Sequence, residues 1–97
     1  MPKGYMISAH RSEADPHKRE AYIRLAIPAL KAAGGTPLSS GDCRVVAKEN
    51  GIAQRTVLIE FDTFEKAIAA YESDDYQKAL KALGDGADRD VRLFEGL

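Results

Sequence analysis

Residues 55–83, RTVLIEFDTFEKAIAAYESDDYQKALKAL, decide the fold of this chain. The segment Val57–Phe61, VLIEF, contains four large apolar side chains, with the β-branched Val57 and Ile59 on one face and Leu58 on the other. A strand that is apolar on both faces is typically covered on both sides of its sheet. The stretch therefore predicts a buried strand that is followed directly by helix.

Two short amphipathic helices are predicted after this strand. Asp62 or Thr63 starts the first helix, because an acceptor at the cap and an acid three residues later form a capping-box-like pattern. Ser73 starts the second helix, because two acids follow it and suit a helix N-terminus. Apolar residues recur at helical spacing in both halves, namely Phe64, Ala67, Ile68 and Tyr71, then Tyr76, Ala79, Leu80 and Leu83.

The chain before this stretch predicts one strand and one long helix. In the strand Gly4–Arg11, Tyr5, Ile7 and Ala9 alternate with Met6, Ser8 and His10. The helix begins at Asp15-Pro16, with Asp as N-cap and Pro at the first position, and ends at Gly34-Gly35. We expect Pro28 to kink this helix without ending it, since the apolar stripe continues beyond the proline.

An edge strand and a closing strand complete the predicted sheet. Thr36–Ser39 and Cys43–Ala47 are predicted as two strand pieces around a bulge or bend at residues 40–42. The Asn50-Gly51 pair is a strong hairpin signal and is expected to join this edge strand to VLIEF. Asp90–Glu95 is the last strand.

The resulting β-α-β-β-α-β order predicts an α+β fold of the ferredoxin-like type, an antiparallel sheet with the helices on one face. Within it, we place the strands Gly4–Arg11 and Val57–Phe61 side by side in the middle and expect this pair to be parallel. The second sheet face has no cover, although the first, third and fourth strands carry apolar residues on both sides. An exposed apolar face of this size implies a partner, and an isologous homodimer through this face is the commonest solution.

The composition argues against several classes of function. Fourteen basic and 15 acidic residues leave a net charge of −1 without a basic stripe, so nucleic-acid binding is not expected. No apolar run approaches the roughly 20 residues of a membrane span. Cys43 is the single cysteine and lacks a CxxC or His cluster beside it, so no structural zinc is expected. We therefore expect a single domain over residues 1–97, in the cytoplasm, without metal, cofactor or membrane partner.

Several motifs, in order along nearly the whole chain, resemble one known family. They are KGYMI, DPHKREAY, LKAAGG, RTVLIEFDTFEKAIAAYESDDYQKAL and RDVRLFEG. Together they are similar to domain-of-unknown-function family 1330. The resemblance implies a dimeric α+β barrel, in which two ferredoxin-like sheets face each other. It implies no established activity, because the family is defined by lacking one.

His10 and Glu60 are the candidate catalytic pair. Each is an ionisable group near the C-terminal end of an otherwise apolar strand, and parallel neighbouring strands would bring the two together. A carboxylate there could orient and charge the imidazole as a general acid–base pair, and would raise the pKa of His10. A one-residue change of register would place them on opposite faces. The alternative for Glu60 is a strand-end carboxylate that reaches water or bonds to a neighbouring strand or helix.

Candidate ligand contacts are Tyr5, Tyr22, Tyr71 and Tyr76, which could line an apolar pocket or simply belong to the core. Arg89-Asp90 and Arg92 are interpreted as rim charges or a dimer salt bridge. Two functions remain open: binding of a small apolar or aromatic metabolite, and cofactor-independent isomerase- or monooxygenase-type catalysis by His10 and Glu60. Binding is favoured because no nucleophile is predicted beside a base. A cavity that reaches both His10 and Glu60 would favour catalysis.

Overall fold

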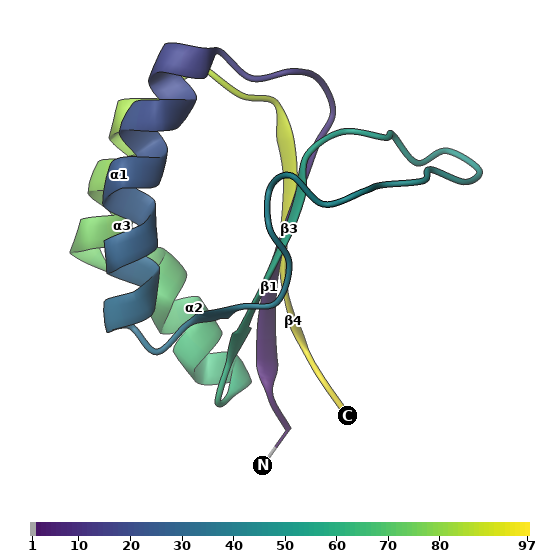
Figure 1. The fold of residues 1–97 in the computed structure, drawn as a ribbon. Coiled ribbons are helices and arrows are strands. Elements are labelled where there is room, and N and C mark those ends of the chain that lie inside the picture. The colour runs from purple at the N-terminus through teal and green to yellow at the C-terminus, as the bar shows by residue number, and fades with distance from the viewer. Residues whose placement is uncertain (1) are drawn as a thin grey trace.

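The computed structural model describes residues 2–97, and within them three helices cover one face of a four-stranded sheet (Figure 1). The strands occupy the order β2-β3-β1-β4 across the sheet, and every neighbouring pair is antiparallel. This arrangement confirms the predicted ferredoxin-like α+β class. The elements are β1 Gly4–His10, α1 Pro16–Ala32, β2 Thr36–Pro37, β3 Thr56–Phe61, α2 Phe64–Glu72, α3 Asp74–Leu83 and β4 Arg89–Glu95.

Helix α1 follows its predicted capping signals. The side chain of Asp15 accepts hydrogen bonds from the backbone N–H groups of His17 and Lys18, both at 3.0 Å. These bonds satisfy two donors that the first helical turn leaves free. The helix continues through Pro28 to Ala32, which confirms that this proline does not end it.

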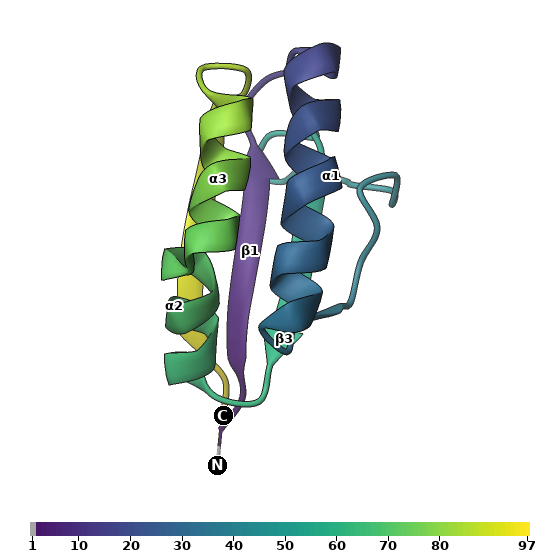
Figure 2. The same cartoon turned by 90° about the vertical axis from the view of Figure 1, so that its left-hand side faces the viewer.

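The predicted break between α2 and α3 is centred on Ser73. Its hydroxyl donates to the carbonyl of Ala70 at 2.8 Å and accepts from the backbone N–H of Tyr76 at 3.3 Å. One side chain therefore ends α2 and begins α3. Helix α3 then packs beside α1 over the sheet (Figure 2).

The central strands β1 and β3 are antiparallel, so the predicted parallel arrangement is wrong. Tyr5 lies opposite Glu60, and Ala9 lies opposite Thr56. Helix α1 returns the chain to the end of the sheet where β1 begins, so β2 runs in the same direction as β1. Strand β3 is antiparallel to β2, and it is therefore antiparallel to β1 as well. The C-terminal ends of β1 and β3 therefore lie at opposite ends of the sheet.

The edge strand β2 covers only Thr36–Pro37, and the predicted strand at Cys43–Ala47 is absent from the described chain. A turn does form, but it spans residues 48–51 with Glu49 and Asn50 in its centre, and no paired strands flank it in the described chain, so the predicted hairpin is wrong. A strand needs a neighbour for its backbone N–H and C=O groups. Residues 42–54 have no such neighbour, because they project from the sheet on the side away from the helices (Figure 1).

The two faces of the sheet differ in cover. The main core lies on the helix side, where large strand residues pack against small helical ones: Met6, Ile59, Phe61, Ala26, Ala29, Ala67, Ala70 and Ala79. The other face carries Tyr5, Ile7, Leu58 and Phe94, and no helix or strand within residues 2–97 covers it. On that face the rings of Tyr5 and Phe94 stack with centroids 5.3 Å apart.

Candidate functional site

A cavity of about 290 Å³ lies between α1, the sheet and the start of the loop after β2. Pockets for small ligands typically measure roughly 300–1,000 Å³, so this cavity suits a small molecule. Most of its wall is apolar and comes from α1, β1, β3 and α3: Met6, Ile23, Ala26, Ile27, Leu30, Val57, Ile59 and Leu83.

The lining changes from apolar to ionisable along the cavity. Strand β1 contributes Met6, then Ser8, then His10, which alternation places on the same face. Helix α1 runs back along β1, and it contributes Leu30 near the apolar end and Arg19 near His10. The two elements thus give the cavity one apolar end and one polar end.

Two further arginines join His10 at the polar end. Arg89 is opposite His10 in the β1–β4 ladder, and the backbone N–H of His10 donates to the carbonyl of Arg55 at 2.9 Å. Both arginines line the cavity together with Arg19. Sequence reasoning missed all three as site residues; the only signal was the alternation that places Arg89 on the same face as Val91 and Leu93.

The environment of His10 favours its neutral form. The side chain is only 7% exposed. Burial lowers the pKa of His10, and the positive charges of Arg89, Arg55 and Arg19 lower it further. The rise in pKa that a carboxylate partner would produce is therefore contradicted.

Glu60 lies on the other face of the sheet, toward the end where β1 begins. Its Oε2 accepts a hydrogen bond from the hydroxyl of Tyr5 at 3.2 Å, and its Oε1 is 3.7 Å from Nζ of Lys3. The antiparallel register causes this separation from His10, so the predicted His10–Glu60 juxtaposition is wrong. The alternative, a strand-end carboxylate bonded to a neighbouring strand, is confirmed.

The four candidate tyrosines divide between the two faces. Tyr22 lines the cavity, and its hydroxyl shares a hydrogen bond of 2.7 Å with that of Tyr76. Tyr76 is fully buried behind it, with the ring of Tyr71 centred 5.2 Å from its own. Tyr5 stands on the opposite face. The structure therefore brings three of the four together and places one of them, Tyr22, at the cavity wall.

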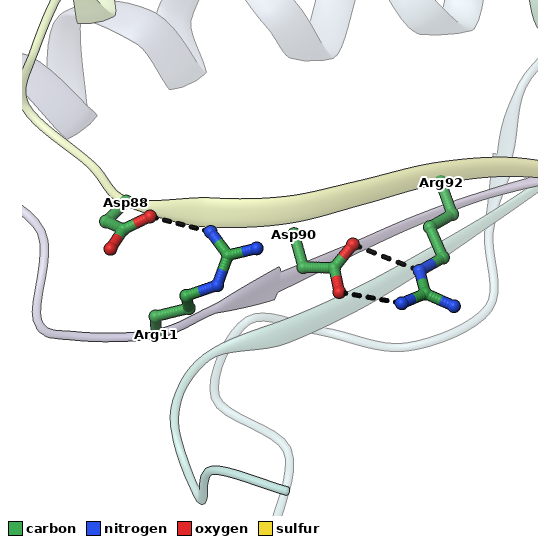
Figure 3. A network of polar contacts seen from close by, with 4 residues as sticks. All are labelled: Arg11, Asp88, Asp90 and Arg92. Atoms are coloured by element: carbon green, nitrogen blue, oxygen red, sulfur yellow. Dashed lines mark hydrogen bonds and ion pairs between the residues drawn. The ribbon is translucent and has the colours of Figure 1, made fainter.

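Arg89 is held against the cavity wall by Tyr22 and Ser8. Its guanidinium lies 4.8 Å from the centre of the Tyr22 ring and donates to the Tyr22 hydroxyl at 3.2 Å and to Oγ of Ser8 at 3.3 Å. The neighbouring Asp90 and Arg92 pair with each other on the uncovered side of the sheet (Figure 3). Arg89 thus differs from the rim charge predicted for it.

The sequence matches one family model, the domain of unknown function DUF1330, over residues 3–97. The chain belongs to the DUF1330 family. This match confirms the resemblance found in the motifs, and it assigns no activity. No curated protein matches this DUF1330 chain.

Solved structures similar to this DUF1330 chain share its fold. A protein of unknown function from Rhodopseudomonas palustris has a TM-score of 0.71 and 16% identity, with 99% of this chain and 83% of that chain covered. A dimeric ferredoxin-like protein of unknown function from Thermobifida fusca has a TM-score of 0.55 and 16% identity, with 97% and 91% covered. A Nitrosomonas europaea protein, provisionally described as an antibiotic biosynthesis monooxygenase, has a TM-score of 0.56 and 17% identity, with 99% and 90% covered. At these identities the similarity shows the fold alone.

Neither a metal cluster nor a membrane-spanning helix is found in the part of the DUF1330 chain that the structure describes. Within residues 2–97, no three His, Cys, Asp or Glu side chains gather closely enough to hold a metal ion. No helix in the same part of the chain combines the length and apolarity required to cross a membrane.

Proposed function

We propose that this protein binds a small apolar or aromatic metabolite in the cavity between α1 and the sheet. The observation that carries this proposal is the cavity itself, about 290 Å³ with a largely apolar wall in a chain of 97 residues. Protein interiors are close-packed, and side chains around a void lose van der Waals contacts on one side. A ligand that fills the cavity would restore those contacts.

Two neutral probes, octan-1-ol and 3-phenylpropan-1-ol, test this proposal. In a titration followed by amide NMR shifts, we expect saturable changes at Ser8, Ile23 and Val57, which line the cavity. The variant Ala26→Leu fills part of the cavity and should weaken the binding. Ala21→Leu is the matched control, because Ala21 is exposed on the same helix.

A second cavity variant covers the case in which Ala26→Leu does not fold. Ile27→Trp lies at a partly exposed position of the cavity wall and should weaken the same probes. Absence of saturable shifts with both probes in the wild-type protein would contradict the binding function.

Catalysis without a cofactor is the second candidate, favoured by one observation. His10 faces the cavity, and its lowered pKa leaves a neutral imidazole able to accept a proton from a bound substrate. In this mechanism His10 acts without Glu60, which lies on the other face of the sheet. Deuterium uptake from D₂O at the carbon beside the carbonyl of phenylpyruvate should exceed the buffer rate and be lost in His10→Gln. Equal rates in the two proteins would exclude this role.

We further propose that the protein is a homodimer whose subunits pack through the uncovered sheet face. Support comes from the apolar side chains Tyr5, Ile7, Leu58 and Phe94, of which Phe94 is 41% exposed. A protein of similar fold from Thermobifida fusca is described as dimeric. Two such faces would cover each other through the same residues in both subunits.

A further inference from the structure

Three arginines converge on one end of the cavity without an acidic residue to balance them. Arg19 comes from α1, Arg55 from the loop before β3, and Arg89 from β4. None of the three takes part in an ion pair within residues 2–97. All ion pairs in this part of the chain are formed by other side chains. No Asp or Glu of this described part lines the cavity.

The whole chain makes this local excess of charge unusual. Its 14 basic and 15 acidic residues nearly cancel, so three unpaired arginines in one place are not a consequence of a basic composition. All three are half-buried. Like charges that are partly removed from water repel each other, and salt screens them less than it screens fully exposed charges.

His10 reports the sign of the potential at this end of the cavity. Every charged side chain that acts strongly on it is an arginine, namely Arg89 from β4, Arg55 from the loop and Arg19 from α1. All of them oppose a proton on the imidazole. An anion at the same place would be attracted by all three.

One of the three guanidinium groups is already held in position, and a second lies against the backbone of Gly41. Arg89 is fixed by its bonds to Ser8 and Tyr22. Arg55 packs so closely over Gly41 that a Cβ atom at position 41 would overlap its guanidinium. Donors that are fixed in advance lose little conformational entropy when they bind a ligand.

We infer that the ligand is an amphipathic carboxylate, whose apolar body lies between α1 and the sheet and whose carboxylate meets Arg19, Arg55 and Arg89. This inference rests on the proposed binding function and specifies the class of ligand. The four residue steps from Met6 to His10 span about 13 Å at roughly 3.3 Å per step, which sets the length of the ligand. The planar guanidinium fork matches a carboxylate with two parallel hydrogen bonds.

Matched probes separate the carboxylate from the apolar body. Octanoate and 3-phenylpropanoate are compared at pH 7.5 with octan-1-ol and 3-phenylpropan-1-ol by isothermal titration calorimetry. We expect each acid to bind at least roughly tenfold more tightly than its alcohol, as charge-assisted hydrogen bonds typically contribute. Added NaCl should weaken the acids and leave the alcohols nearly unchanged.

The variant Arg55→Gln tests the cluster itself. It should weaken the binding of octanoate and leave the affinity for octan-1-ol nearly unchanged, without loss of fold. Arg44→Gln is the matched control, because Arg44 is exposed on the same loop, does not line the cavity and changes the net charge equally. Two further probes are added: octyl phosphate, a third head group on the same alkyl chain, and acetate, a carboxylate without the apolar body.

The outcomes distinguish the two proposals. Equal affinity for acids and alcohols contradicts the carboxylate inference and leaves the binding function standing. Binding of acetate as tightly as octanoate, with no alcohol bound, supports an anion site and contradicts the apolar cavity function. No binding of any probe contradicts both. Octyl phosphate binding more tightly than octanoate, or equal effects of Arg55→Gln and Arg44→Gln, overturns the carboxylate assignment.

Discussion

His10 obtains its chemical character from residues that are distant in the sequence. The alternation of side chains along β1 places residue 10 on the cavity face, but it does not determine the protonation state of the side chain there. The arginines that surround it come from α1, from the loop before β3 and from β4, and burial acts in the same direction as their charges. The result is a neutral imidazole in a cationic pocket.

The pKa of His10 predicts how stability depends on pH. Its ordinary value is 6.5, and the folded protein lowers it through burial and through Arg89, Arg55 and Arg19. Below about pH 6.5 the unfolded chain therefore binds more protons than the folded one, so the free energy of unfolding falls as the pH decreases. Carboxyl groups such as Asp15 have lowered pKa values from an ordinary 3.8 and act only at more acidic pH.

Urea unfolding of the wild type at pH 7.5 and 5.5 should show this loss of stability. The variant His10→Gln should lose less over the same interval. His17→Gln is the control, since His17 is exposed and outside the cavity, and it should behave like the wild type. If His10→Gln and the wild type lost the same free energy of unfolding between pH 7.5 and 5.5, the predicted contribution of His10 would be contradicted.

At the scale of the elements, the α2–α3 break depends on one serine. The hydroxyl of Ser73 serves both helix ends, and Gln77 adds a bond across the break by donating to the carbonyl of Tyr71 at 2.8 Å. The break turns α3 so that Tyr76 and Leu83 face the core and the cavity. The α2–α3 break therefore helps to position the part of α3 that lines the cavity.

The variant Ser73→Ala removes both hydroxyl bonds and should lower the free energy of unfolding by about 1 kcal/mol, as loss of an N-cap typically does. For a chain of this size, that loss should lower the melting temperature by roughly 4–8 °C. Ser73→Thr keeps the hydroxyl and should retain most of the stability. Thermal unfolding by circular dichroism measures both; an unchanged midpoint in the alanine variant would show that the cap is dispensable.

Which elements could be predicted depends on how local their causes are. Asp15, Ser73 and Pro28 act within a turn or two of helix, so the helix ends and the break were predicted from the sequence. The strand expected at Cys43–Ala47 depended on a neighbour that the fold does not provide. Its residues look suitable for a strand, but strand propensity depends strongly on packing context.

The candidate site was predicted less well, because it depends on strand direction. Placing His10 beside Glu60 required parallel strands, and the reversal between β2 and β3 makes them antiparallel. His10 and Tyr22 were identified and do line the cavity. The arginine cluster is assembled from separate segments of the chain, so no local motif could indicate it.

At the scale of the whole molecule, the proposed dimer predicts the effect of a charge on the uncovered sheet face. Leu58→Asp would place an unpaired ion in the interface, at a cost of roughly 3–5 kcal/mol. We expect the dimer to weaken by about a hundredfold or more. Leu25→Asp is the control, because Leu25 is 45% exposed on α1, in the layer on the other side of the sheet.

Sedimentation velocity at micromolar concentration distinguishes the two variants. The wild type and Leu25→Asp should sediment as dimers, and Leu58→Asp should sediment as a folded monomer. A wild-type protein that is monomeric at this concentration would exclude the dimer. If all three proteins sedimented as dimers, the interface would have to lie on another surface than the uncovered sheet face.

The central position of β1 also has a consequence for how the molecule is assembled. This strand precedes the others in the chain, yet its ladder partners come late: Gly4 pairs with Phe61 on one side and with Glu95 on the other. During synthesis both edges of β1 stay unpaired until the later strands emerge, which exposes it to pairing with other chains. Helical turns form from neighbouring residues and can appear much earlier. Since β4 also brings Arg89, the cationic end of the cavity is among the last features of the protein to be completed.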